Sequence, residues 1–101
     1  MKKIDVTGKV KDRNGEDGGA IAEAIAGSLD MIPAPDYKIA IRQRKMSDEA
    51  MRALHNGGVM NVEDADFTRL VEVINMAGRE KILPPRVVAA VGERLDAAEE
   101  T

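Results

Sequence analysis

Apolar and polar residues alternate near the start of the chain, which is the pattern of an extended segment. A period of two places Ile4, Val6 and Val10 on one face, so this stretch predicts a short strand. Asn14-Gly15 follows, a dipeptide that tolerates the positive φ of a tight turn. We therefore expect a small hairpin, or a turn after the strand, because the residues beyond are too polar and glycine-rich for a long second strand.

The spacing of apolar residues changes to three and four after Gly19, which indicates a helix that packs one face inward. The members of this stripe are Ile21, Ala24, Ile25, Ser28, Leu29 and Ile32. Pro33 and Pro35 are expected to end the helix near Met31, because proline lacks the amide that a continuing helix needs.

A second helical segment spans residues 36–55. Asp36 is its expected N-cap, and Ser47 offers another cap because its hydroxyl can accept from the free amides of a first turn. The pattern leaves open whether these residues form one helix or two with a break at Met46. Its apolar side carries Tyr37, Ala40 and Ile41, and its basic side carries Lys38, Arg42 and Lys45. Gly57 and Gly58 permit a left-handed stop after it.

The most regular helical pattern follows a short extended linker at residues 59–60. Asn61 is its expected cap, and Glu63 and Asp64 suit the positive end of the helix dipole. Its inward stripe is Phe67, Leu70, Val71, Ile74 and Ala77, with Arg69, Glu72 and Asn75 outside it. Gly78 is expected to end this helix.

A last helix is introduced by Pro84 and Pro85, since proline is tolerated in a first turn where the missing amide has no intrahelical partner. Its buried stripe is Val87, Val88, Val91 and Leu95. No internal repeat or low-complexity tract interrupts the pattern.

Taken together, the pattern predicts a single domain over residues 1–101 in the mainly α (α+β) class. Residues 1–18 supply a short strand or hairpin, and residues 19–98 supply a compact bundle of about four helices. The acidic tail, residues 99–101, is expected to fray.

The composition is that of an ordinary soluble domain, with 101 residues of which 33% are charged and 44% hydrophobic. The absence of cysteine excludes a disulfide framework, a thiolate metal site and a thiol nucleophile. A net charge of −3 differs from the basic footprint of a typical DNA-binding domain. No apolar run has the length of a transmembrane helix or of a signal sequence, so we expect an unprocessed cytoplasmic protein without a membrane partner.

Candidate catalytic and metal-binding groups are sparse. His55 is the only imidazole, so no Cys–His pair or histidine ligand set is available. Asp12, Asn14 and Glu16 alternate like the oxygen ligands of a calcium loop, but Asp17 stands where such a loop needs glycine, which favours a solvated turn. We therefore predict no catalytic residue, no cofactor, no metal site and no enzymatic activity.

Two groups of side chains are candidates for contact with a partner. Arg42, Arg44 and Lys45 form the only dense basic cluster, which suits phosphates or an acidic protein surface, although a solvated helix face is the more usual meaning. The six methionines fill gaps in a core that has only two aromatic residues, yet flexible thioethers also suit an adaptable partner surface. The candidate partner-binding residues are Arg42, Arg44, Lys45, Met46, Met51 and Met60.

Five segments carry a resemblance to a known group of proteins. They are the strand residues 4–7, residues 10–15 with a Lys-Asp-x-x-Gly turn, the apolar helix residues 21–25, residues 54–62 with an Asn-Gly stop, and residues 82–91 with paired prolines. Their order is similar to that of a family of small phage and prophage proteins. The chain departs from that pattern in residues 33–35 and in the extra Gly58. The resemblance implies a compact phage-encoded domain without known catalytic residues, and it carries over no functional residue.

Our leading hypothesis is a non-enzymatic phage or prophage protein that acts through protein–protein contact. Its partner would be a phage structural protein during assembly of the virion head or tail, or a host factor that it binds or inhibits, which places it in the bacterial cytoplasm or the virion. The alternative is a nucleic-acid-associated regulator of transcription or replication that sets Arg42, Arg44 and Lys45 against phosphates. The pattern leaves the oligomeric state open.

Overall fold

The computed structural model describes residues 1–101 and contains four helices with small antiparallel sheets. The helices are α1 (Ile21–Met31), α2 (Tyr37–His55), α3 (Asp64–Arg79) and α4 (Pro85–Asp96). The strands are β1 (Lys2–Asp5), β2 (Lys9–Lys11), β3 (Asp17–Ala20), β4 (Val59–Val62) and β5 (Glu99–Glu100). The predicted α+β class, with an N-terminal hairpin and four helices, is confirmed.

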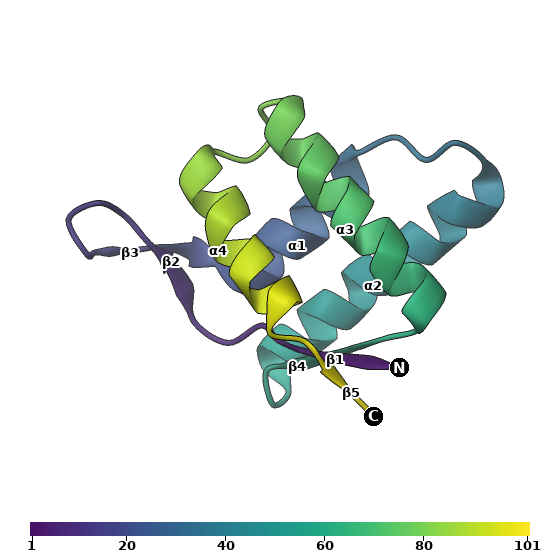
Figure 1. Ribbon diagram of the computed structural model, residues 1–101, viewed down its shortest axis with the longest axis horizontal. Coiled ribbons are helices and arrows are strands. Elements are labelled where there is room, and N and C mark those ends of the chain that lie inside the picture. Colours follow the sequence, from purple (N-terminus) through teal and green to yellow (C-terminus); the bar gives the residue numbers. More distant parts are fainter.

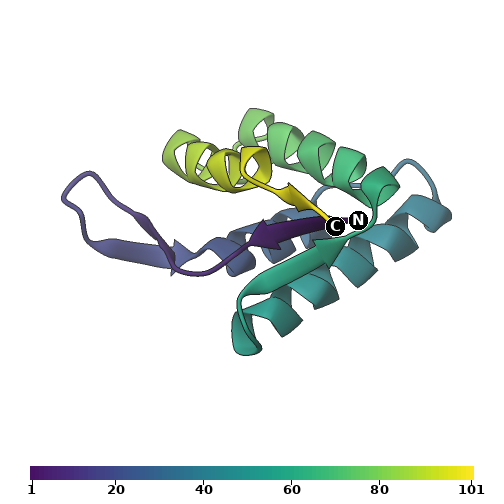
Figure 2. The same cartoon turned by 60° about the horizontal axis from the view of Figure 1, so that its bottom comes forward.

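Two layers of helices make up the body of the molecule, with α1 beside α2 and α3 beside α4 (Figures 1 and 2). The strands β1, β4 and β5 lie together at one end, where the two chain termini meet (Figure 1). The β2–β3 hairpin projects from the body away from the two termini in both views. The core between the layers is contributed by every helix and by β1 and β4.

The three-stranded sheet corrects two predictions. Residues 59–60, expected as a linker, begin strand β4, which pairs antiparallel with β1 so that Ile4 lies opposite Met60. The tail expected to fray forms β5, in which Glu100 lies opposite Lys2 and their side chains pair at 3.5 Å. Strands this short carry too few residues for an alternating pattern to be recognised, and their partners are distant in sequence.

The stretch predicted as a single strand through Ile4, Val6 and Val10 is divided into two strands, β1 and β2. Gly8 has a φ of +81°, a left-handed conformation that turns the chain between β1 and β2. The predicted hairpin turn is confirmed, with Gly15 at φ +80°. The Asp12 carboxylate accepts hydrogen bonds from the amides of Asn14 (2.8 Å) and Glu16 (2.9 Å), so this oxygen holds the turn closed.

Residues 37–55 form one helix, which settles the open question of a break at Met46. Asp36 is the N-cap as predicted, and its side chain accepts from the amide of Ile39 at 2.9 Å. The second predicted cap is wrong, because Ser47 is buried in mid-helix and donates to the carbonyl of Ala26 in α1 at 3.4 Å. Tertiary contact with α1 uses the hydroxyl that local sequence rules assign to a helix start.

The boundaries of α3 also differ from the prediction. Asn61 lies in β4 and does not cap the helix, whose N-cap is Glu63. The helix continues past Gly78 to Arg79, and the left-handed residue that follows is Lys81, at φ +59°. The predicted starts and stops elsewhere are confirmed: α1 ends at Met31, Gly57 and Gly58 take positive φ after α2, and Pro85 occupies the first turn of α4.

Candidate functional site

The corner between α1 and α2 exposes an unusual share of large apolar side chains. Met31 is 64% exposed, Tyr37 72% and Ile41 42%, and these are three of the five large hydrophobic residues that the molecule leaves exposed. Tyr37 and Ile41 lie one turn apart on the same side of α2. We call these three residues, with the connecting loop 32–36, the α1–α2 corner.

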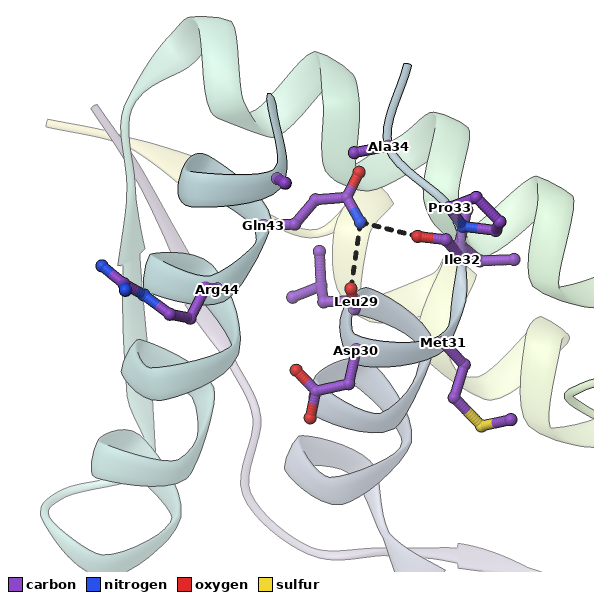
Figure 3. Close-up of a pocket in the computed structure, with 9 residues that line it drawn as sticks. Leu29, Asp30, Met31, Ile32, Pro33, Ala34, Gln43 and Arg44 are labelled. Atoms are coloured by element: carbon purple, nitrogen blue, oxygen red, sulfur yellow. Dashed lines mark hydrogen bonds between the residues drawn. The ribbon is translucent and has the colours of Figure 1, made fainter. Parts of the chain in front are cut away.

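A hollow of about 290 Å³ opens at this corner. It is lined by Leu29, Asp30, Met31, Ile32, Pro33, Ala34, Ala40, Gln43 and Arg44 (Figure 3). Pro33 and Pro35 stop α1 and keep the loop extended until Asp36 starts α2, so the loop forms one wall of the hollow. The opposite wall comes from Ala40 and Arg44, one turn apart on α2.

A buried polar cluster fixes the shape of the corner. Gln43 is 3% exposed, and its side-chain amide nitrogen donates to the carbonyls of Leu29 (3.0 Å) and Ile32 (2.9 Å), as Figure 3 shows. Its oxygen accepts two hydrogen bonds from the Arg69 guanidinium, at 2.9 and 2.8 Å, and Arg69 also donates to the carbonyl of Pro33 at 3.2 Å. Carbonyls at the end of α1 that lack helical partners are satisfied in this way.

Arg69 is a buried hydrogen-bond donor of the corner that the sequence pattern missed. It was expected outside the buried stripe of α3, yet it is 8% exposed and reaches both α2 and the loop. Its charge is balanced at the surface by Glu72, whose carboxylate lies 3.1 Å from the guanidinium. An arginine one position from Leu70 gives no local signal that its planar head will serve as a buried donor.

The basic cluster predicted on α2 is divided by the fold. Arg42 is tied to Asp66 of α3 by an ion pair, so it holds two helices together instead of facing a ligand. Arg44 and Lys45 are exposed, and Arg44 lines the hollow of the corner. The Asp66 carboxylate therefore takes Arg42 out of the predicted group of three cations, and only Arg44 and Lys45 stay without an acidic partner.

The methionines divide into buried and exposed residues. Met46 and Met60 are 4% and 0% exposed, so partner contact is wrong for both and their gap-filling role is confirmed. Met51 is half-buried and packs against the core. The thioethers that face outward are those of Met1 and Met31, and the sequence interpretation did not place Met31 among the candidate partner-binding residues. A helix-ending methionine outside the apolar stripe, followed by two prolines, was the available signal.

Titratable groups with displaced pKa values lie away from the corner. A hydrogen bond from the Thr7 hydroxyl lowers the pKa of Asp5, and the Lys11 ammonium lowers the pKa of Asp17. The bidentate contact with Arg52 lowers the pKa of Glu49. Each displacement comes from a visible hydrogen bond or ion pair near the surface, and the structure contains no group of three His, Cys, Asp or Glu side chains arranged to hold a metal ion.

Neither the family models, nor the curated proteins, nor the solved structures contain a match to this chain. None of the four helices combines the length and the apolar character needed to cross a bilayer.

Proposed function

We propose that this chain is a non-enzymatic interaction protein that binds another protein through the α1–α2 corner. The observation that supports this proposal is the exposure of three large apolar side chains on the two helices that form the corner: Met31, which lines the hollow, and Tyr37 and Ile41 on α2. Exposed apolar patches rimmed by polar residues are typical of protein-binding surfaces. Tyrosine, methionine and arginine are also the side chains enriched in such interfaces.

Preorganisation adds to this argument. The loop of the corner is held by the hydrogen bonds of Gln43 and Arg69, so a partner would meet a surface that is already ordered. A rigid surface loses less conformational entropy on binding than a mobile one. Arg44 at the rim supplies a cation that selects a partner with an acidic or carbonyl-rich edge.

The biological setting in the proposal comes from the sequence resemblance to small phage and prophage proteins. In that setting the partner is a phage structural protein during assembly of the virion or a host factor that the protein binds, and the site of action is the bacterial cytoplasm or the virion. The nucleic-acid alternative keeps only Arg44 and Lys45 of its three cations, because Arg42 is engaged by Asp66. We therefore favour a protein partner.

The test is capture of a partner from bacterial lysate and from purified virions, at low and high salt, with identification by mass spectrometry. The double variant Tyr37→Gln/Ile41→Gln should reduce recovery of the same protein about tenfold or more, because central apolar contacts dominate interface energies. Unchanged circular dichroism and unfolding midpoint would show that the variant is folded.

Val59→Gln provides the matched control, since Val59 is 40% exposed and lies on β4, away from the corner. It should leave capture unchanged. Equal loss with both variants would contradict the proposal. Recovery of nucleic acid that disappears at high salt, with no protein retained, would favour the alternative because each neutralised phosphate releases counterions.

A further inference from the structure

The outer edge of β2 presents unpaired backbone groups to solvent. Two hydrogen bonds bracket the β2–β3 ladder, Ile21 N to Gly8 O at 3.2 Å and Asp12 N to Glu16 O at 2.9 Å. In an antiparallel ladder these positions make Lys9–Ala20 and Lys11–Asp17 the pairs that do not exchange hydrogen bonds. The amides and carbonyls of Lys9 and Lys11 therefore point away from β3.

These four backbone groups have no hydrogen-bond partner within the chain. The strand that carries them is regular, because the irregularity of the hairpin places its extra residue in β3, where residues 17–20 face residues 9–11. An edge of this kind is a template onto which another strand can pair.

A groove of about 320 Å³ separates this strand from α4. It is lined by all three residues of β2, by Ile21 at the start of α1 and by residues of α4, so it runs between β2 and α4. On the α4 side, the small side chains of Ala89 and Ala90 leave room for a backbone to approach. In Figure 1 the hairpin reaches out from the body on the side where α4 lies.

The charge of the groove is positive although the chain as a whole carries −3. Its charged lining residues are Lys9, Lys11, Arg86, Arg94 and Glu93. Lys11 and Arg94 have acidic neighbours, Asp17 and Asp5, whereas no ion pair engages Lys9 or Arg86.

We propose that an extended segment of an acidic protein binds here by adding a strand to the outer edge of β2. Main-chain hydrogen bonds with Lys9 and Lys11 would supply affinity, and acidic side chains near Lys9 and Arg86 would supply selectivity. This surface is separate from the α1–α2 corner and does not depend on the function proposed for it.

A second copy of the chain is a poorer occupant of the same edge. Pairing β2 with another β2 places lysines opposite lysines, and like charges across a ladder are destabilising. The acidic strand β5 has the right charge, but it is two residues long and pairs with β1. An acidic segment from a different protein meets neither obstacle.

The experiment uses the full chain and a blocked peptide of about eight residues that alternates Glu with Thr or Val, long enough to span the three residues of β2. Fluorescence anisotropy should show binding that a matched Lys-for-Glu peptide does not reproduce. In hydrogen-exchange NMR, the amides of Lys9 and Lys11 should become protected at saturation, while amides of the α1–α2 corner stay unchanged.

The double variant Lys9→Glu/Arg86→Glu should weaken binding of the acidic peptide about tenfold or more, since it reverses the two cations that no carboxylate engages. Lys38→Glu/Arg79→Glu makes the same change in net charge at exposed positions outside the groove and should bind like the wild type. Both variants replace exposed residues, and circular dichroism would confirm that they fold.

The proposal would be overturned by no binding of the acidic peptide, by binding without protection of the Lys9 and Lys11 amides, or by equal effects of the two variants. Binding of a single-stranded oligonucleotide in place of the peptide would also overturn it. Sedimentation velocity would detect pairing between copies of the chain, which would overturn the choice of occupant.

Discussion

Two strands of this molecule, β4 and β2, have an edge with outward-pointing amides and carbonyls, but side chains hydrogen-bond to these groups only at the β4 edge. In β4, as in β2, alternate residues direct their amides and carbonyls away from the paired strand. The outward amide of Asn61 donates to the Glu49 carboxylate at 2.8 Å, and the outward carbonyl of Val59 accepts from Arg52 at 2.9 Å. At the β2 edge the corresponding groups of Lys9 and Lys11 have no such partners.

The difference lies in the helix beside each edge. Helix α2 places Glu49 and Arg52 one turn apart, joined by two hydrogen bonds of 2.6 and 2.8 Å, so the pair acts as a short substitute for a neighbouring strand. Helix α4 lines the groove beside β2 with Ala89 and Ala90 and with three charged side chains. None of these side chains is hydrogen-bonded to the backbone of β2, and Arg94 donates instead to the carbonyl of Asp5. The comparison shows that an edge is closed or left open by the side chains of its neighbour.

The largest expected effect on stability comes from substituting Gly58, the residue that directly precedes β4. Gly58 has a φ of +74°, and a Cβ placed there would lie 2.1 Å from Cγ2 of Thr7. Gly58→Ala should therefore lower the free energy of unfolding by about 2–4 kcal/mol, through backbone strain together with a steric clash. Urea denaturation monitored by circular dichroism measures this loss.

Gly57→Ala is the matched control for that substitution. Gly57 has a φ of +84° but no atom within 4 Å of its Cβ position, so only the conformational cost of about 1 kcal/mol remains. Equal destabilisation by the two variants would show that contact with Thr7 contributes nothing.

A smaller effect is expected from removing the carboxylate that closes β4. Glu49→Ala should lower the free energy of unfolding by about 1–2 kcal/mol, because it leaves the Asn61 amide and the Arg52 guanidinium without their acceptor. Its exposed neighbour Asp48 makes no hydrogen bond or ion pair through its side chain, so Asp48→Ala should change stability by less than about 0.5 kcal/mol. Hydrogen exchange at Asn61 should accelerate in the first variant alone.

The same edge predicts an acid dependence. The contact with Arg52 lowers the pKa of Glu49 below its ordinary value of 4.5 in the folded protein. A lowered folded-state pKa contributes stability that is complete above the unfolded value and is lost as the pH falls through the folded one. Glu49→Gln should therefore lose less stability than the wild type between about pH 5 and pH 3. Parallel pH profiles from urea titrations would contradict this expectation.

The smallest effect on stability, and the sharpest contrast between the edges, is expected at β2. Lys9→Thr/Lys11→Thr should change the free energy of unfolding by less than about 0.5 kcal/mol, since both side chains are exposed. It should nevertheless increase self-association, because edge lysines oppose strand pairing between copies. Sedimentation velocity over a concentration series measures this, with Lys38→Thr/Lys45→Thr on α2 as the control for lost charge. Association that grows equally in both variants would assign the effect to net charge alone.

The sequence alone determined the positions of most helices, of one helix cap and of the hairpin turn, because these features depend on local chemistry. The apolar stripes of the helices, the cap at Asp36, the prolines that bound α1 and α4, and the Asn14-Gly15 turn act over a few residues, so their pattern is visible in the chain itself. These features were enough for the α+β class and for the order of the helices.

Only the tertiary structure decided which side chains face outward and which strands pair. Ser47 and Arg69 are polar residues buried by contacts with other helices, while Met31 and Tyr37 are apolar residues left exposed. The pairing of β1 with β4 and β5 joins segments more than 50 residues apart. Burial and pairing of this kind depend on contacts between segments that are distant in sequence. Short strands and single polar residues show no periodic pattern from which such contacts could be predicted.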